Sequence, residues 1–251
     1  IYHPSVNIKY DPIENSLRVL KGETAVDAVP FYDSYHNFNV QVDEIKWYIN
    51  QDSLIFGEAK KGISSDSKSL YFESPGYFSA REFARIQSIS NVNPIIILKI
   101  MSEKGDTRTH EAIDVAKRIN PKYNIGTAQT LFYDLVASGF INYDKEDETI
   151  EVRDKVFHYA DASRDRIDYD RLKISSKTSA SNATVNTKTN VMTVENVKGV
   201  ELSPIHRVAM VPANRKLRIM KDRSMGMDGN MFAGLASFEG QGLNFNYAQF
   251  S

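Results

Sequence analysis

The chain has 251 residues and a formal net charge of −1, with 41% hydrophobic and 25% charged residues. This composition is ordinary for a globular protein and argues against a general polyanion binder, which would be strongly basic. Because the chain has no cysteine, disulfides, thiolate metal sites and cysteine nucleophiles are excluded.

The first third of the chain shows the alternation of β-strands. Val6, Ile8 and Tyr10 alternate with polar residues, and a turn at 11–16 precedes an apolar run at 17–20. Two further alternating runs, at 38–42 and 45–49, are out of step with each other. We interpret this shift as a bulge or bend in one long strand.

A region of short strands leads from the β part to a helical part. Strands are expected at 54–57 and 70–72, with a polar loop from Lys60 to Lys68 between them. Ser79 then has the position of a helix cap ahead of an apolar face.

Residues 93–139 show the pattern of three consecutive helices. Asn93-Pro94 is a typical start, because Asn caps free N–H groups and Pro at the first helical position loses no hydrogen bond. Thr109 is expected to cap the second helix and Asn124 the third. Gly139 is expected to end the third helix in a left-handed conformation.

A β-hairpin is predicted directly after the third helix. Strand-like residues at 140–143 and 149–153 flank a polar turn at 144–148. Three helices followed by a two-stranded hairpin resemble winged-helix proteins, over about a quarter of the chain. The resemblance implies a third helix suited to the major groove of DNA.

The charges of this module disfavour nucleic acid as its partner. The outward positions of the third helix include no Arg or Lys, and the hairpin tip has one Lys against four acidic residues. DNA binding depends on cations that neutralise phosphates and read guanine. We therefore interpret the module as a packing or protein-contact element, with Ile125, Gln129 and Tyr133 as candidate contacts.

The last third of the chain returns to β. An Asp- and Arg-rich segment at 161–170 is interpreted as a salt-bridged turn rather than a calcium loop. The polar stretch Lys173 to Asn190 is either a solvated strand pair or a flexible connector. Short strands are then expected at 191–194, 200–202, 208–211, 217–219, 233–238 and 243–247.

We predict an α+β fold in which mainly antiparallel β regions, as a sandwich or stacked sheets, flank a central winged-helix-like module. The expected regions are 1–75 (β), 76–160 (helical linker and module) and 161–251 (β). Because the chain begins and ends in β, the module is alternatively an insert in one continuous β structure.

No motif identifies a catalytic, cofactor or metal site, and we assign none. The five histidines lack the spacing of a metal pair. Asp33-Ser34-Tyr35-His36 places nucleophile, acid and base types together, but a triad is recognised by geometry, and a turn with an aromatic anchor is the favoured interpretation.

A basic stretch at 207–223 carries a net charge of +5. It is a candidate contact for an anionic partner. The alternative, which we favour, is that charges on hairpins and edge strands resist edge-to-edge pairing. The candidate anion contacts are Arg215, Lys216, Arg218, Lys221 and Arg223.

The chain as a whole resembles a segment of very long, uncharacterised proteins of Bacteroidota. The residues that carry the resemblance are His3-Pro4, Ser34-Tyr35-His36, Trp47, Phe56-Gly57, Phe72-Glu73-Ser74, Asn93-Pro94, Gly139-Phe140, Asp168-Tyr169-Asp170, Gly234, Phe245-Asn246-Tyr247 and Phe250. The resemblance implies a piece of a large β-rich protein exported to the cell envelope, with a cytoplasmic location as the alternative. It supplies no activity and no functional residue.

Three functions remain open at this stage. The first is a non-catalytic structural or protein-interaction segment of a large envelope protein, whose partners are other parts of the same long chain or other proteins. The second is a nucleic-acid-binding regulator that uses Lys122, Thr127, Gln129 and Thr130. The third is a glycan-binding or glycan-processing domain.

Overall fold

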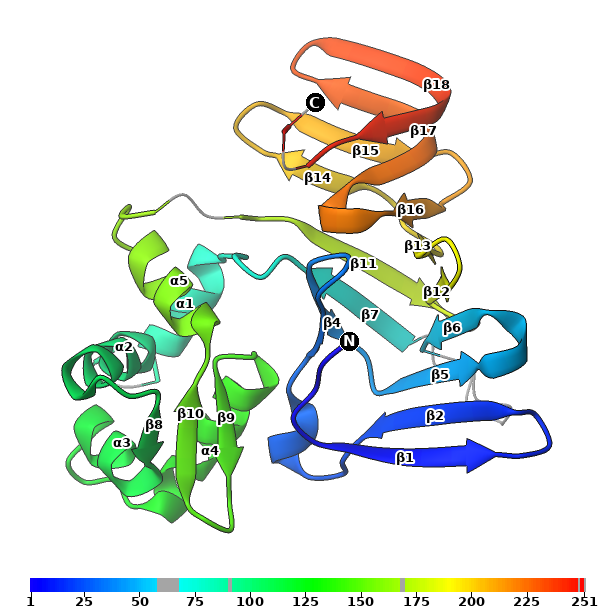
Figure 1. The fold of residues 1–251 in the computed structure, drawn as a ribbon. Coiled ribbons are helices and arrows are strands. Elements are labelled where there is room, and N and C mark those ends of the chain that lie inside the picture. The colour runs from blue at the N-terminus through cyan, green and yellow to red at the C-terminus, as the bar shows by residue number, and fades with distance from the viewer. Residues whose placement is uncertain (58–67, 90–91, 168–169, 248, 251) are drawn as a thin grey trace. The chain divides into compact units, whose positions relative to one another are not determined.

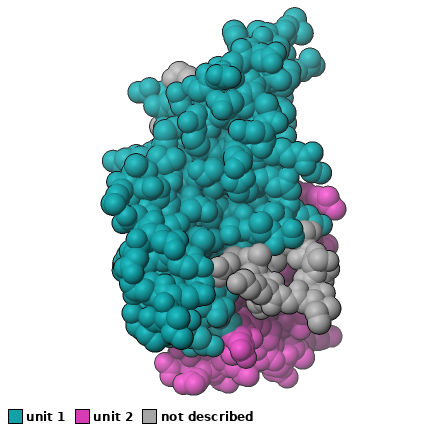
Figure 2. Space-filling view, turned by 90° about the vertical axis from the view of Figure 1, so that its right-hand side faces the viewer, with its two compact units in different colours: residues 1–22, 31–74, 172–251 teal, residues 23–30, 75–171 magenta. Residues whose placement is uncertain are grey.

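The computed structural model describes all residues except 58–67, 90–91, 168–169, 248 and 251. The polar loop predicted at 60–68 lies almost entirely outside the described residues, as do Asp168 and Tyr169. The chain forms two compact units (Figure 2): unit 1 comprises residues 1–22, 31–74 and 172–251, and unit 2 comprises 23–30 and 75–171. Residues 23–30 and 161–171, which we expected in the β regions, thus belong to unit 2.

Unit 1 contains two antiparallel sheets (Figure 1). The larger sheet has the order β1-β2-β5-β6-β12-β13-β16-β17-β15-β14, with β18 on the other edge of β17. Its strands are β1 Val6–Asp11, β2 Ser16–Lys21, β5 Glu44–Tyr48, β6 Ser53–Phe56, β12 Ala183–Asn186, β13 Val191–Val194, β14 Val200–Ser203, β15 Val208–Pro212, β16 Leu217–Ile219, β17 Met225–Ala233 and β18 Ala236–Phe245. The smaller sheet has the order β11-β7-β4-β3, with β3 Phe31–Asp33, β4 Phe38–Gln41, β7 Lys68–Glu73 and β11 Lys173–Thr178. Two 3-10 turns complete the unit, η2 Ile49–Gln51 and η3 Lys221–Arg223.

The N- and C-terminal β regions are joined by hydrogen bonds inside both sheets. Strand β6 pairs with β12 in the larger sheet, and β7 pairs with β11 in the smaller one. The two sheets share one core, because Phe56 from the larger sheet and Phe72 from the smaller have ring centroids 6.5 Å apart and are both fully buried. The mixed α and β content with antiparallel sheets confirms the predicted fold class at this coarse level.

The interpretation of 38–49 as one long strand is wrong. Strand β4 belongs to the smaller sheet and β5 to the larger. The chain changes sheets between them, and of the second alternating run only Ile45 joins the shared core, since Trp47 and Ile49 are each 39% exposed. The predicted strand at 233–238 is also wrong, because Gly234, with φ +62°, lies in the turn between β17 and β18.

Five hairpins in the described part of the chain use one turn chemistry. The first turn residue accepts backbone N–H groups two or three residues ahead through its side-chain oxygen, and the residue four positions later has a positive φ. The first residues are Asp11, Asp33, Asp144, Asn186 and Ser203. The positive-φ residues are Asn15, Asn37, Glu148, Asn190 and Arg207, with φ between 46° and 60°. Short polar side chains suit the first position, and Asn tolerates the positive φ at the second in three of the five turns.

Unit 2 is helical and has a small three-stranded antiparallel sheet of order β8-β10-β9. Its elements are η1 Ala25–Ala28, α1 Ala80–Gln87, α2 Pro94–Gly105, β8 Thr109–Glu111, α3 Ala112–Ile119, α4 Ile125–Ala137, β9 Ile141–Asp144, β10 Thr149–Val152 and α5 Asp154–Ala162. The three predicted helices and the hairpin are confirmed as elements. We had expected Thr109 to cap α3. This expectation is wrong, because Thr109 lies in β8 and pairs with Glu151.

The helix caps of unit 2 follow from the sequence. Asn93 Oδ1 accepts the N–H of Ile95 at 2.9 Å, and Asn124 Oδ1 accepts that of Thr127 at 2.9 Å. Gly139 has φ +76°, the left-handed conformation that a helix C-terminus commonly needs. The core beneath is aromatic: Phe140 and Tyr159 are fully buried with ring centroids 4.8 Å apart.

Candidate functional site

Helix α4 is the element that the sequence offered as a possible nucleic-acid-binding surface. Ala128, Phe132 and Leu135 are fully buried, while Thr127 and Thr130 are exposed. The capping box of Asn124 and Thr127 fixes where the helix begins and therefore which side faces solvent. That solvent side carries no Lys or Arg.

The three candidate contacts on α4 are partly used inside unit 2. Ile125, Gln129 and Tyr133 follow one another at spacings of four and are all half-buried. The Nε2 of Gln129 donates to the hydroxyl of Tyr133 at 2.6 Å, and the Tyr133 ring lies 6.3 Å from that of buried Tyr143. These side chains therefore present less free surface than their sequence positions indicate.

The neighbouring hairpin tip is acidic and solvated. Residues 144–148 are all exposed, and Asp144 Oδ1 accepts the N–H groups of Glu146 and Asp147 at 2.9 and 3.0 Å. Arg85 reaches α4, but there its guanidinium pairs with Asp134 at 2.8 Å. The surface formed by α4 and this hairpin would repel phosphates rather than attract them.

The segment 23–30 packs against α4 and β9 within unit 2. Its Val29 is fully buried in the same core as Phe132. A Cβ added at Gly139 would lie 3.4 Å from the Pro30 ring. Helix α4 is thus held by a part of the chain that the sequence pattern gave no reason to bring there.

The candidate anion contacts of unit 1 lie on and on either side of strand β16. Arg215 and Lys216 precede β16, whereas Lys221 and Arg223 follow it. Lys216 pairs with Glu195 at 3.1 Å, Arg215 donates to Asn196 at 3.3 Å, and Arg223 lies over the ring of Tyr247 at 4.9 Å. Arg218, in β16 itself, is exposed. Three of the five candidate anion contacts therefore already have partners in the protein.

Asp33 and His36 form a buried hydrogen-bonded pair in unit 1, which we call the polar tie. His36 Nδ1 lies 2.7 Å from Asp33 Oδ2 and Nε2 lies 2.8 Å from the carbonyl oxygen of Asn190. Burial alone would raise the pKa of Asp33, but the hydrogen bonds and charge of His36, with backbone bonds from His36 and Tyr35, outweigh it and lower that pKa. The two contacts of His36 join the β3–β4 turn to the β12–β13 turn.

The triplet Asn182-Ala183-Thr184, which fits the N-glycosylation sequence Asn-X-Thr, lies in unit 1. Asn182, which begins an Asn-X-Thr triplet, is fully buried and donates to the Ser176 carbonyl oxygen at 3.2 Å, so it does not present a glycosylation site. Among the described residues, no group of three or more His, Asp or Glu is placed to hold a metal ion.

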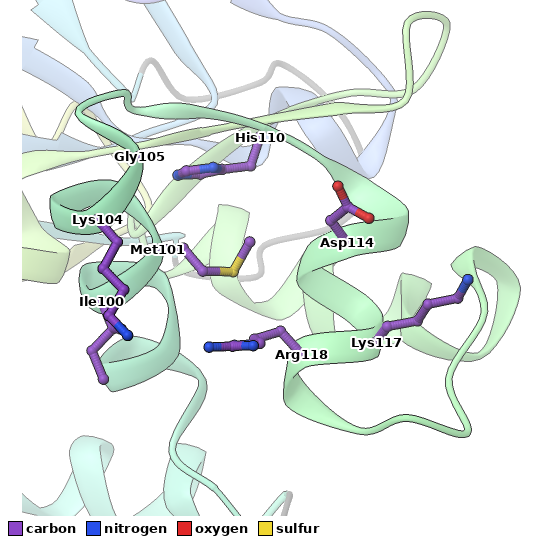
Figure 3. Close-up of a pocket in the computed structure, with 8 residues that line it drawn as sticks. All are labelled: Ile100, Met101, Lys104, Gly105, His110, Asp114, Lys117 and Arg118. Atoms are coloured by element: carbon purple, nitrogen blue, oxygen red, sulfur yellow. The ribbon is translucent and has the colours of Figure 1, made fainter.

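A surface hollow of about 470 Å³ lies between α2 and α3 (Figure 3). Ile100, Met101 and His110 in its lining are half-buried. Arg118 extends from α3 toward α2, and Lys104 runs along α2 past Ile100. The residues that line it are Ile100, Met101, Lys104, Gly105, His110, Asp114, Lys117 and Arg118. We call this hollow the α2–α3 pocket.

His110 is fixed at the edge of the α2–α3 pocket. Its Nε2 lies 3.0 Å from the Ser102 hydroxyl. Burial lowers its pKa, and the nearby charge of Asp114 opposes this shift without cancelling it. Sequence analysis missed this pocket, because its residues come from three elements and no motif joins them. The available signal was the Lys and Arg residues near the ends of two consecutive helices.

Among the described residues, no helix combines the length and the apolar character needed to cross a membrane. No protein-family model, curated protein or solved structure matches this chain.

Proposed function

We propose that the chain is a non-catalytic structural and protein-interaction segment. In this proposal unit 1 supplies the contact surface, and the α2-to-β10 part of unit 2 is a winged-helix-like insert with an architectural role. The observation that carries it is the distribution of exposed apolar side chains. Of the large apolar side chains that are exposed among the described residues, all but Ile89, Val92 and Ile167 lie in unit 1.

Four of the exposed apolar residues of unit 1 lie near one end of the β15–β17–β18 region. Leu235 is 99% exposed and Ile205 is 83% exposed. Their two turns are adjacent, because the Gly234 N–H donates to the carbonyl oxygen of Arg207. Phe232 and Phe238 are also exposed. We call Ile205, Phe232, Leu235 and Phe238 the hairpin-tip patch.

The register places the hairpin-tip patch on both sides of the sheet. Phe232 lies opposite Ser237, and Phe238 lies opposite Met231, so the two rings point to opposite faces. Lone exposed apolar residues are common and need no explanation. Four gathered around two adjacent turns are instead typical of a protein contact.

The winged-helix-like assignment of unit 2 is supported by its element order. Helix α2, strand β8, helices α3 and α4, and the β9–β10 hairpin follow one another, and β8 pairs with β10. The cation-free solvent side of α4, next to an acidic tip, disfavours DNA as its partner and supports an architectural role for the module. The envelope location implied by the resemblance stays a prediction.

A DNA-binding assay separates this proposal from the regulator. Titration of labelled duplex DNA with the whole chain at moderate salt is expected to show no retention. A salt-sensitive dissociation constant below roughly 10⁻⁶ M would overturn the proposal. Replacing the acidic residues at 144–148 by Lys would tighten DNA binding if α4 and the hairpin contacted phosphates, and no change is expected.

A second assay addresses the hairpin-tip patch directly. The chain is expected to self-associate weakly at high concentration, because an exposed apolar patch associates when no partner is present. Sedimentation velocity of the double variant Ile205→Ser, Leu235→Ser should show less association. Ile13→Ser is the matched control, since Ile13 is 93% exposed in the β1–β2 turn. If the double variant and Ile13→Ser reduced association equally, the hairpin-tip patch would not be the contact surface.

A further inference from the structure

The α2–α3 pocket is positively charged although unit 2 is negatively charged. Unit 2 has fourteen Lys and Arg against eighteen Asp and Glu, a net charge of −4. The pocket lining has Lys104, Lys117 and Arg118 against Asp114 alone, a net charge of +2 with His110 neutral. The local charge is therefore opposite in sign to that of the unit around it.

Within the described part of the chain, these three cations lack the ion pairs that Arg85 and Lys99 of the same unit form. Arg85 pairs with Asp134, and Lys99 pairs with Glu103 and Asp161. No ion pair is recorded for Lys104, Lys117 or Arg118 with any residue that the structure describes. Since Lys104 and Arg118 both line the pocket, their like charges repel each other, and an anion in the pocket would relieve that repulsion.

Helix dipoles give an ordinary reason for cations at these positions. Lys104 is in the last turn of α2, and Lys117 and Arg118 are in the last turn of α3. Each helix C-terminus is equivalent to roughly half a negative charge. Two such ends offset about one unit of the net +2, so positive charge remains in the pocket. The dipoles also do not require Arg118 to extend across toward α2.

The pocket also has an apolar part. Ile100 and Met101 are half-buried on the α2 side, and Met101 lies beneath the ring of His110 in Figure 3. A volume of about 470 Å³ lies within the range of ~300–1,000 Å³ found for small-molecule sites. Apolar lining with a few polar groups at one side is the usual composition of such sites.

We propose that the α2–α3 pocket binds a small organic anion, an apolar or aromatic body that bears a phosphate or carboxylate group. Arg118 and Lys104 hold the anionic group, and Arg118 can donate two parallel N–H bonds to it. Ile100, Met101 and the ring of His110 contact the body. The site lies on unit 2 alone and is independent of the hairpin-tip patch.

The test is a titration of the ¹⁵N-labelled whole chain with phenyl phosphate at low salt, followed by amide chemical shifts. Saturable shifts are expected around Met101, Gly105, His110 and Arg118. Benzoate in place of phenyl phosphate distinguishes a carboxylate site from a phosphate site. Inorganic phosphate, which lacks the body, and benzyl alcohol, which lacks the charge, are each expected to bind at least tenfold more weakly.

Charge-reversal variants connect the binding to the named side chains. Arg118→Glu and Lys104→Glu should each weaken phenyl phosphate at least tenfold, and Arg118→Gln should weaken it less. Both residues are exposed, so the fold should persist, as checked by circular dichroism. Lys145→Glu makes the same charge change on the hairpin tip and should alter affinity less than twofold.

Three results would overturn the proposal. They are the absence of saturable shifts with both phenyl phosphate and benzoate, shifts centred outside the pocket, and an equal loss of affinity in Lys145→Glu and Arg118→Glu. None of these would bear on association through the hairpin-tip patch.

Discussion

The two units use the same turn chemistry but treat their apolar side chains differently. The β9–β10 hairpin of unit 2 and the hairpins of unit 1 share an Asp, Asn or Ser at the first turn position and a positive φ four residues later. Unit 2 folds its hairpin against helices and closes one core around Phe132, Phe140 and Tyr159. Unit 1 extends its larger sheet strand by strand and leaves apolar residues in solvent.

This difference teaches that local turn geometry does not decide whether a hairpin becomes self-sufficient. A hairpin is stable when one face packs against something else. In unit 2 that partner is helical and comes from the same unit. In unit 1 the smaller sheet covers part of the larger one, and the end of the β17–β18 hairpin keeps its apolar residues exposed, which is why we assign the interaction role to unit 1.

The largest expected effect is on the closed core of unit 2. Phe132→Ala removes a fully buried ring that lies 5.4 Å from that of Tyr143, and such changes cost about 3–5 kcal/mol. The helical circular dichroism signal should be lost at a lower denaturant concentration. If the units unfold separately, the β signal of unit 1 keeps its midpoint. A coincident shift of both signals would show that the comparison of two separate units is wrong.

The next effect tests the polar tie in unit 1. Asp33→Asn removes the negative charge that accepts hydrogen bonds from His36 and two backbone N–H groups. The free energy of unfolding should fall by about 1.5–3 kcal/mol at neutral pH. Because the pKa of Asp33 is lowered in the folded state, its contribution is present above the unfolded value of ~3.9 and is lost as pH falls through the lower folded value. Stability measured by denaturant from pH 5 downward should decline more steeply in the wild type. Equal slopes would contradict the ionised tie.

A smaller effect is expected where α4 meets the segment 23–30. Gly139→Ala forces a Cβ onto a backbone with φ +76° and brings it 3.4 Å from Pro30. A cost of about 1–2 kcal/mol is expected, because non-glycine residues are strained in this region. Thermal unfolding measures it. Ala137→Gly, at an exposed helix end nearby, is the control and should cost less.

The smallest effect is expected on the surface of unit 1. Lys188 pairs with Asp52 at 2.6 Å, and this pair raises the Lys188 pKa. Solvent screens such an exposed pair. Lys188→Ala should leave the thermal midpoint unchanged within error, and a clear decrease would mean that surface charges contribute more to the sheet than packing suggests.

The sequence predicted local structure well where periodicity and caps agree. Asn93, Asn124, Ser79 and Gly139 each begin or end a helix as expected, because capping depends on neighbouring residues alone. The strand Met225–Ala233 was missed, since Gly226, Asp228 and Gly229 interrupt its pattern. Gly229 is required there: a Cβ would lie 2.4 Å from the Val211 carbonyl oxygen, a contact that only the partner strand reveals.

Long-range arrangement could not be predicted in the same way. Two consecutive alternating runs placed β4 and β5 in one strand, and nothing in them indicated that they belong to different sheets. The α2–α3 pocket likewise requires knowing that Arg118 and Met101 face one space. Helical spacing predicts which residues share a face of one helix, but not which faces of two helices meet.

The position of residues 75–171 between the two halves of unit 1 has a consequence for synthesis on the ribosome. Strands β6 and β7 emerge long before their partners β12 and β11, which follow the whole of 75–171. Unit 2 has all its residues available first and can fold while unit 1 is still half made. The nascent N-terminal strands must therefore wait with open edges, and an excised fragment 75–171 would lack Val29, leaving an apolar gap where that side chain belongs.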